Sequence, residues 1–165
     1  MKKYTLETTE GISKIPQKTY ENLWNSNSFS TPFTKWEFLV AMEVTGCVGE
    51  NSGWLPRPLL VYDENSILCG IAPRYAKFHS YGEYVFDWSW ANAYEKSGES
   101  YFPKWLVASP FSPVPGTRIL TLNDQEKTNM LNLLVEETKQ KGFSSIHLLF
   151  GNNQELEDAE KIFVK

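Results

Sequence analysis

The residues best suited to chemistry lie together in one aromatic-rich segment, residues 78–90. Within it His79, Glu83 and Asp87 follow at intervals of four, and Tyr81 lies between the first two. A carboxylate or imidazole group among aromatic rings loses hydration, which shifts its pKa and is how many general bases are tuned. We therefore expect Glu83 or Asp87 to act as a base or a substrate-orienting group, with His79 and Tyr81 beside them. For each residue taken singly, the alternative is a buried, hydrogen-bonded group that ties a strand to a loop.

The spacing of these side chains limits how they can meet. Alternating aromatic residues over 83–88 predict a strand. If that strand extends back to His79, then His79, Glu83 and Asp87 share one face, but at ~3.3 Å per residue each lies ~13 Å from the next. This distance excludes a single hydrogen-bonded triad and favours a groove that contacts an extended substrate. A turn at Gly82 is the alternative, because it would bring His79 back toward Asp87.

Aromatic residues are concentrated around this segment. The chain contains 6 Trp, 8 Tyr and 10 Phe, and half of these rings fall within residues 75–111. Trp and Tyr bury large areas, so a compact core would account for many of them, and a groove for a flat or extended ligand is the alternative. In the groove interpretation, we expect Trp88, Trp90, Tyr94 and Phe111 to form the substrate-binding wall.

A carrier such as acyl-CoA presents a pyrophosphate, which binds free backbone N–H groups at the start of a helix. Only the loop of residues 115–118 offers a glycine next to a basic side chain in a suitable region. We therefore take Gly116, Thr117 and Arg118 as candidate cofactor-binding residues. The strand-like residues 119–120 follow them where the pattern expects a helix, so a plain turn is the alternative.

Motifs and composition exclude several function classes. The sequence contains no GxGxxG, P-loop, GxSxG, HExxH or paired CxxC motif. Neither Cys47 nor Cys69 has a histidine at ligand spacing, so we expect no bound metal. With 16 basic and 20 acidic residues the formal charge is -4, and the scattered basic residues argue against DNA as a partner. No apolar run reaches the ~18 residues of a membrane span and no signal peptide is evident, so we expect a cytoplasmic protein.

Hydrophobic periodicity predicts a mixed α/β (α+β) chain, with a mostly antiparallel central sheet flanked by helices. The expected strands cover residues 4–8, 59–62, 67–72, 83–88, 105–108, 118–121 and 145–150. The expected helices cover residues 13–25, 34–45, 90–98, 123–141 and 154–164, with a loop over 46–58. Thr34 and Asn123 are the expected helix caps, each with a glutamate three residues later. His147, alone in the last strand, is expected to pack in the structure and not to catalyse. Because the sequence contains no repeat and no linker, we expect residues 1–165 to form one domain.

Three longer segments carry a family resemblance: Gly53–Pro58, His79–Trp88 and Pro110–Arg118. Their order and spacing resemble the predicted N-acyltransferases that are often labelled peptidoglycan biosynthesis or FemAB-like proteins, and the similarity covers residues 32–150. The resemblance implies a GNAT-type fold and the transfer of an acyl group onto an amine. It also implies acyl-CoA or, as in the FemAB relatives, aminoacyl-tRNA as the co-substrate, and a small-molecule or peptide acceptor.

Members of this group resemble two GNAT-like halves in tandem. The resemblance therefore implies that this chain is a first half, which lacks the last strands of its sheet and is incomplete as a catalyst alone. Such a half is expected to pair with a separate C-terminal half or with itself, because unpaired strand edges favour association. The alternative function is a non-catalytic binding module whose aromatic groove holds a sugar, a peptide or a partner chain.

Overall fold

A long kinked hairpin connects the two halves of the fold in the computed structural model, which describes residues 3–163. Its first side is β2 (Trp54–Pro56) followed by β3 (Leu59–Tyr62), and its second side is β4 (Leu68–Ala72) followed by β5 (Arg74–Lys77). A proline interrupts each side, and the N–H of Arg57 still donates to the carbonyl of Arg74 across the break (2.7 Å). Because the pairing continues while the hairpin bends, its two ends belong to different sheets.

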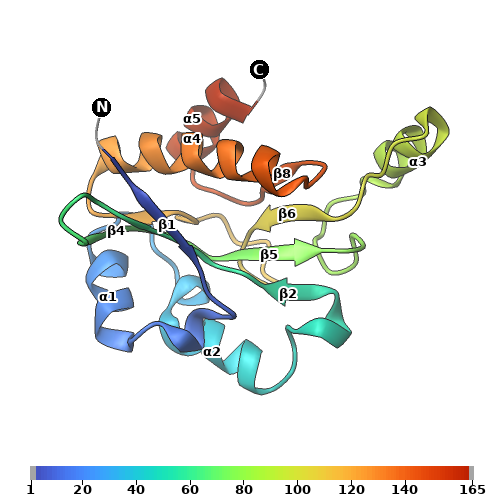
Figure 1. The fold of residues 1–165 in the computed structure, drawn as a ribbon. Helices are drawn as coiled ribbons and strands as arrows, with labels where there is room; N and C mark the ends of the chain where they lie inside the picture. Colours follow the sequence, from blue (N-terminus) through green and yellow to red (C-terminus); the bar gives the residue numbers. More distant parts are fainter. Residues whose placement is uncertain (1–2, 164–165) are drawn as a thin grey trace.

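Each sheet has four strands in the described part of the chain (Figure 1). The first has the order β1-β3-β4-β7, with β1 at Thr5–Thr8 and β7 at Leu120–Thr121, and all its pairs are antiparallel. The second has the order β2-β5-β6-β8, with β6 at Lys104–Val107 and β8 at Ile146–Leu148. Only the β6–β8 pair is parallel, because the chain crosses over through helix α4 (Asp124–Lys141) between them.

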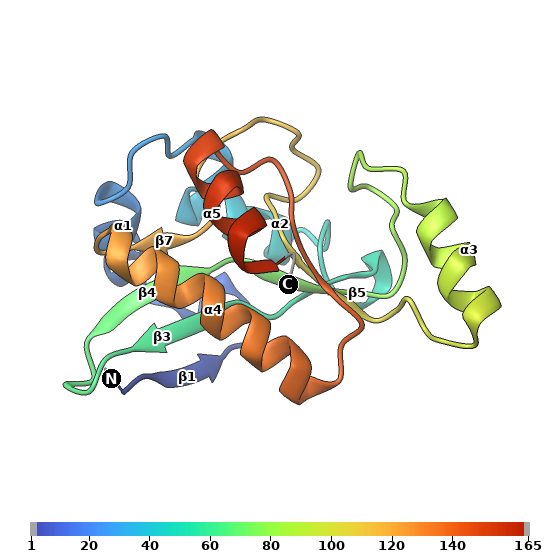
Figure 2. The ribbon, with the colours of Figure 1, turned by 90° about the horizontal axis from the view of Figure 1, so that it is seen from above.

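Helices cover both faces of the first sheet (Figures 1 and 2). Helix α4 and helix α5 (Asn153–Phe163) lie on one face, and α1 (Gln17–Asn25) and α2 (Trp36–Val44) lie on the other. Successive residues of a strand point to opposite faces. Accordingly Leu59 packs in the core beneath α4, while its neighbour Leu60 packs in the core formed with α1 and α2. Three single 3-10 turns complete the described chain at Ile12–Lys14, Pro32–Thr34 and Glu50–Ser52.

Between β5 and β6 the chain leaves the body of the molecule as an arm, residues 78–103 (Figures 1 and 2). Helix α3 (Trp88–Ser97) forms the outer part of the arm, and none of its residues is buried. A helix with no buried face has no packing to hold it against the core. The arm is therefore attached to the body through its base.

The predicted mixed α/β class and the mostly antiparallel pairing are confirmed, with the strands divided between two sheets. The predicted cap of α4 is also confirmed, since the Asn123 side chain accepts a hydrogen bond from the N–H of Glu126 (3.0 Å). The predicted cap at Thr34 is wrong: Thr34 ends a 3-10 turn and α2 begins at Trp36. None of the helices within residues 3–163 is long and apolar enough to cross a membrane.

The strand predicted over residues 83–88 is wrong. Gly82 and Tyr84 both have positive φ (79° and 58°), which turns the chain back instead of extending it. Two real strands, β2 and β5, were missed. All four residues of β5 are buried although two of them are charged, and Arg74 is neutralised by an ion pair with Glu137 of α4. A buried strand with paired charges looks like a surface segment in sequence.

Candidate functional site

Two lysines face each other at the base of the arm. Lys77 of β5 and Lys104 of β6 are directly opposite in the antiparallel register, and both side chains are 0% exposed. Like charges opposite one another destabilise a strand pair, and an unpaired buried ammonium group costs several kcal/mol. Two lysines in this position therefore require nearby negative charge.

The arm supplies two carboxylates to this lysine pair. The Lys104 ammonium donates to Glu83 Oε2 (2.8 Å), Asp87 Oδ2 (2.6 Å) and Ser80 Oγ (3.0 Å). These three bonds use all three donors of the ammonium group. Tyr101, near the other end of the arm, donates its hydroxyl to the same Asp87 oxygen (2.8 Å). We call Lys77, Ser80, Glu83, Asp87, Tyr101 and Lys104 the lysine cluster.

Lys77 has a different set of contacts. Its ammonium donates to the carbonyl of Tyr81 (3.1 Å) and lies 3.7 Å from Glu83 Oε1. It also lies 4.1 Å from the centre of the Trp54 ring, a cation–π contact. Lys77 therefore has one hydrogen bond from the protein, compared with three for Lys104, and its charge is less fully compensated.

Burial and ion pairing shift the pKa values of these groups by different amounts. Burial raises the pKa of Glu83, and the neighbouring ammonium groups only partly oppose it. Burial also opposes ionisation of Asp87, but its interactions with Lys104, Ser80 and Tyr101 outweigh that effect and lower the Asp87 pKa to about 2. Burial lowers the pKa of Lys77 to about 8. Of the two carboxylates, Glu83 is therefore the one that holds a proton more readily.

Two buried oxygens of the cluster, Glu83 Oε1 and Asp87 Oδ1, have no hydrogen-bond partner among residues 3–163. Buried polar atoms are nearly always paired, so each such atom marks a place where a donor would be stabilised. The two residues themselves are 2% and 6% exposed. A donor can reach these oxygens only if the arm moves.

The structure brings Glu83 and Asp87 together although an extended strand would have kept them ~13 Å apart. The turn at Gly82 and Tyr84 makes this possible, so that both carboxylates bind one ammonium group. His79 does not join them: its Nδ1 accepts from the N–H of Tyr81 (3.2 Å). The chain does turn at Gly82, but the residue that lies beside Asp87 is Glu83 and not His79.

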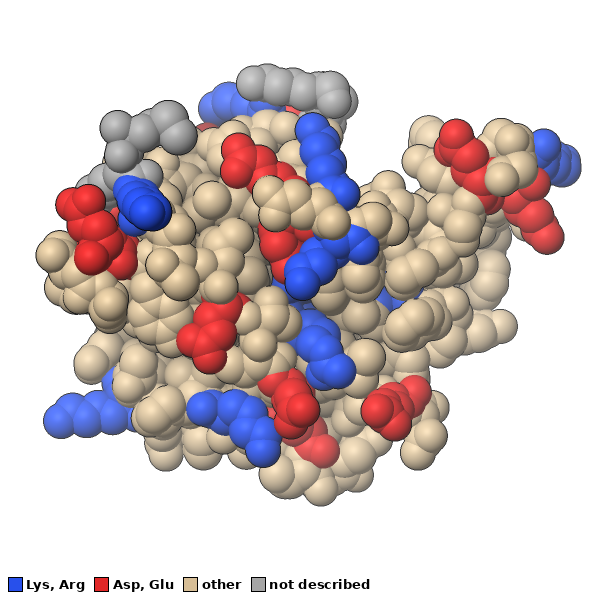
Figure 3. Space-filling view, viewed as in Figure 1, with Lys and Arg blue, Asp and Glu red and all other residues tan. Residues whose placement is uncertain are grey.

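The predicted groove residues, and Tyr81 from the predicted catalytic set, differ in how exposed they are. Tyr81, Trp88 and Trp90 are 63%, 47% and 66% exposed, and the rings of Tyr81 and Trp88 contact each other edge to face with centroids 5.4 Å apart. Tyr94 is half-buried beside Tyr101, and Phe111, on the loop after β6, packs against Trp54. Figure 3 shows the arm standing away from the body, with its charged residues gathered at its outer end in this view.

The three predicted cofactor residues lie elsewhere, and the structure buries all of them. The N–H groups of Gly116 and Thr117 donate to the carbonyls of Phe150 (3.0 Å) and Phe29 (3.1 Å). The Arg118 N–H donates to the carboxylate of Glu155, and its guanidinium donates to backbone carbonyls, including that of Leu149. These donors are already engaged, so a pyrophosphate would have to replace existing bonds.

Sequence reasoning missed Lys77, Lys104 and Tyr101. A signal was present for the lysines, since each lies next to an aromatic residue at the end of a short strand, in Tyr-Ala-Lys-Phe and Pro-Lys-Trp. A lysine in such a setting is either at a surface or paired inside. Choosing between these requires the strand register, which the sequence does not display.

A family model described as FemAB-like, peptidoglycan biosynthesis/recognition, matches residues 11–164. The match spans nearly the whole chain, and the protein therefore belongs to the FemAB-like family, as its sequence segments predicted. No significant match was found among curated proteins or among solved structures.

Proposed function

We propose that this protein takes part in the transfer of an acyl or aminoacyl group to an amine of a cell-wall peptide, with Glu83 as the group that accepts the proton. Membership of a peptidoglycan-related family supports the class of acceptor. The observation that carries the proposal is the contrast within the lysine cluster: the Glu83 pKa is raised and its Oε1 lacks a hydrogen bond, whereas Asp87 has a pKa of about 2. A base works best when its pKa approaches the working pH.

The other cluster residues have supporting roles in this proposal. Asp87 fixes Lys104, which in turn orients the Glu83 carboxyl. Tyr81 and Trp88, exposed beside the cluster, provide an aromatic wall for the acceptor, with Trp90, Tyr94 and Phe111 further along it. His79 orients Tyr81 and takes no proton. Because Glu83 is buried, binding of the acceptor includes a movement of the arm base that uncovers Oε1.

The proposed donor is acyl-CoA or aminoacyl-tRNA, both cytoplasmic carriers, and we place the reaction in the cytoplasm. Gly116, Thr117 and Arg118 are the candidate donor-binding residues, through bonds exchanged with their present acceptors. We further propose that residues 1–165 act as one domain and that pairing with a second GNAT-like half completes the cleft.

The test is a transfer assay with the protein, a lysine-containing muropeptide and either acetyl-CoA or charged tRNA, with products detected by mass spectrometry. Glu83→Gln is expected to lower the rate at least about 100-fold, because general base catalysis contributes about 10²–10⁴-fold. Asp87→Asn is expected to lower it less and to leave the pH profile set by Glu83 in place. Equal rates for the wild type and Glu83→Gln would remove Glu83 from the chemistry.

The second candidate function is a non-catalytic binding module for a cell-wall fragment, and a specific observation favours it. Both carboxylates are buried and ion-paired, as in a structural anchor, while the aromatic rings on the arm are exposed. In this case muropeptide binding is retained in Glu83→Gln and lost in Trp88→Ala. Binding without turnover by any donor, combined with that pattern, would favour the module over the enzyme.

A further inference from the structure

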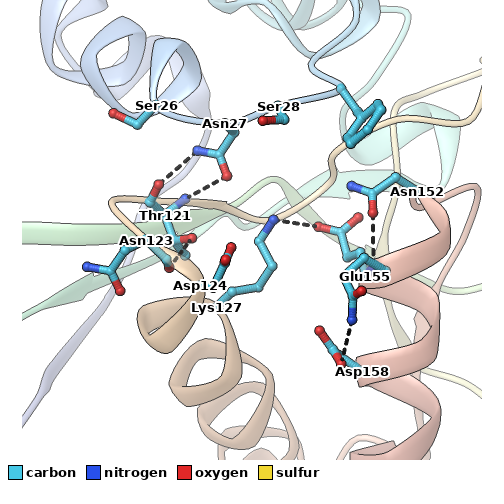
Figure 4. Close-up of a pocket in the computed structure, with 12 residues that line it drawn as sticks. Ser26, Asn27, Ser28, Thr121, Asn123, Asp124, Lys127, Asn152, Glu155 and Asp158 are labelled. Carbon is cyan, nitrogen blue, oxygen red and sulfur yellow. Dashed lines mark hydrogen bonds and ion pairs between the residues drawn. The ribbon is translucent and has the colours of Figure 1, made fainter.

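A polar pocket lies where the loop after α1 meets the N-terminal ends of α4 and α5 (Figure 4). Its volume is about 370 Å³, and no residue of the arm or of the lysine cluster lines it. Amide, hydroxyl and carboxylate side chains form most of its wall, together with one ammonium group and one aromatic ring. Its volume falls within the range of about 300–1,000 Å³ that is usual for small-ligand sites, although its wall is more polar than in most of them.

Phe29 supplies the aromatic ring. It is 76% exposed, and its backbone has a φ of 61°. The left-handed region is unfavourable for a bulky side chain and is usually occupied by Gly or Asn. Here the backbone is held in place because the Phe29 carbonyl accepts a hydrogen bond from the N–H of Thr117 (3.1 Å). Since most of the ring packs against nothing, core packing does not explain why phenylalanine occupies this position.

The same residue also borders a second hollow of about 420 Å³, which shares Asn152 and Gln154 with the first. Phe29 therefore lines two adjoining depressions together with the side-chain amides of Asn152 and Gln154. An exposed ring and amides in one wall are suited to a ligand that has both a flat apolar face and polar substituents at its edge.

The charges in the pocket argue against an anionic ligand. Lys127 is the single basic residue in the wall, against the carboxylates of Asp124, Glu155 and Asp158. A phosphate would enter a site of net negative formal charge, which repels it. A ligand without charge avoids this repulsion.

Lys127 and Glu155 set the hydrogen-bonding character of the pocket. Glu155 is fully buried, and its carboxylate accepts from the N–H groups of Arg118 and Ile119. The Lys127 ammonium lies 3.9 Å from Glu155 Oε1, beyond hydrogen-bond length, and reaches across the pocket as Figure 4 shows. The ammonium donors of Lys127 are thus available to a ligand. Asp158 Oδ1 already accepts from Gln154 (3.1 Å) and Lys161 (3.3 Å), so a ligand can donate to the other Asp158 oxygen and to the Asp124 carboxylate.

We propose that this pocket binds a pyranose sugar, stacked on Phe29 and hydrogen-bonded to Lys127 and the acidic and amide side chains. A sugar hydroxyl both donates and accepts, so it matches a wall that mixes ammonium and amide donors with carboxylate acceptors. The C–H groups on one face of a pyranose ring pack against the face of an aromatic ring, which accounts for the exposed Phe29. This inference is independent of acyl transfer and of the lysine cluster.

The experiment is a titration of the full chain with N-acetylglucosamine, followed in two-dimensional amide NMR spectra. Saturable shifts are expected for residues 26–29 and 152–155, with no change along the arm. Glycerol at the same concentration is the control ligand, because it offers hydroxyls without a ring face, and it is expected to cause no saturable shift. The absence of saturable shifts with the sugar, or equal shifts with glycerol, would overturn the proposal.

Three variants separate binding from stability. Phe29→Asn removes the ring and suits the left-handed backbone, so binding is expected to weaken at least about tenfold while the Tm stays equal or rises. Phe29→Tyr keeps the ring and is expected to keep binding. Phe86→Asn is the matched control, since this arm ring is 86% exposed, and it is expected to bind as the wild type does. Normal binding by Phe29→Asn, or loss in Phe86→Asn instead, would place the sugar elsewhere and sink the inference.

Discussion

At the scale of single residues, Lys104 is the group on which the arm depends. Lys104→Met leaves Glu83 and Asp87 buried without their ammonium partner, and breaking a buried ion pair in this way costs about 3–5 kcal/mol. We expect a loss of that size in the free energy of unfolding, measured with urea. The control is Lys96→Met on exposed α3, expected to change it by less than about 0.5 kcal/mol. Equal stability of the two variants would mean that the ion pairs of Lys104 contribute nothing to stability.

His147 gives a pH-dependent prediction. Burial first, and the Lys104 ammonium second, lower the His147 pKa from 6.5 to about 4. As the pH falls through 6.5 the unfolded chain takes up a proton that the folded chain accepts only near pH 4, so the stability contributed above pH 6.5 is lost over that window.

The expected loss from His147 is about 1–3 kcal/mol between pH 7 and pH 4. Urea unfolding at several pH values measures it, and the difference between the wild type and His147→Gln isolates this residue from His79, whose pKa burial also lowers. An identical pH dependence in the two proteins would contradict the prediction.

At the scale of elements, α3 differs from the other helices. None of its ten residues is buried, and isolated helices shorter than about 12–15 residues are marginal in water. We expect its amide hydrogens to exchange much faster than those of α4, whose residues Met130, Leu131 and Leu134 pack in the core. Hydrogen–deuterium exchange followed by mass spectrometry compares the two helices in one experiment. Equal protection of α3 and α4 would show that the arm packs against something.

The elements also show what sequence can and cannot predict. Helix α4 was predictable because its cap, its apolar positions and its terminal Gly142 all indicate the same helix. The β3–β4 hairpin was predictable for a similar reason, with turn residues between two apolar runs. Strand β5 was not, because its charged residues are buried only through tertiary contacts. Arg74 pairs with Glu137 of α4, which is far away in sequence, and Lys77 pairs with Glu83 only because the arm turns back.

The candidate site was also predictable only in part. Glu83 and Asp87 could be selected from the sequence as carboxylates among aromatic residues, but their contact depends on Lys104, which lies beyond α3 at the start of β6. Aromatic and polar residues alternate over residues 83–88, and this alternation predicted a strand. In the structure the segment turns instead, with the two carboxylates pointing inward and the aromatic side chains outward, and this arrangement produces a similar alternation in the sequence. Local pattern cannot separate these two cases; the difference lies in the tertiary contact.

At the scale of the whole molecule, the lysine cluster closes a loop in the chain. The arm leaves the second sheet at Lys77 and returns at Lys104, two residues that are paired across the strands. Glu83 and Asp87 bring one negative charge for each lysine, so four buried charges sum to zero only when the arm base is in place. The buried lysines of the second sheet are therefore neutralised only when the base of the arm lies against them.

Removing both carboxylates should release the arm without unfolding the body. In Glu83→Gln/Asp87→Asn, Lys77 and Lys104 face each other without counter-charge, and the arm base is expected to open. Chymotrypsin cuts after exposed aromatic residues, and we expect cleavage within residues 78–103 to become at least about tenfold faster, since local opening controls proteolysis. The matched control, Glu95→Gln/Glu99→Gln, removes two charges from the exposed part of the arm and should be cut at the wild-type rate. Cleavage spread evenly through both sheets would instead mean that the cluster stabilises the whole fold and not the arm alone.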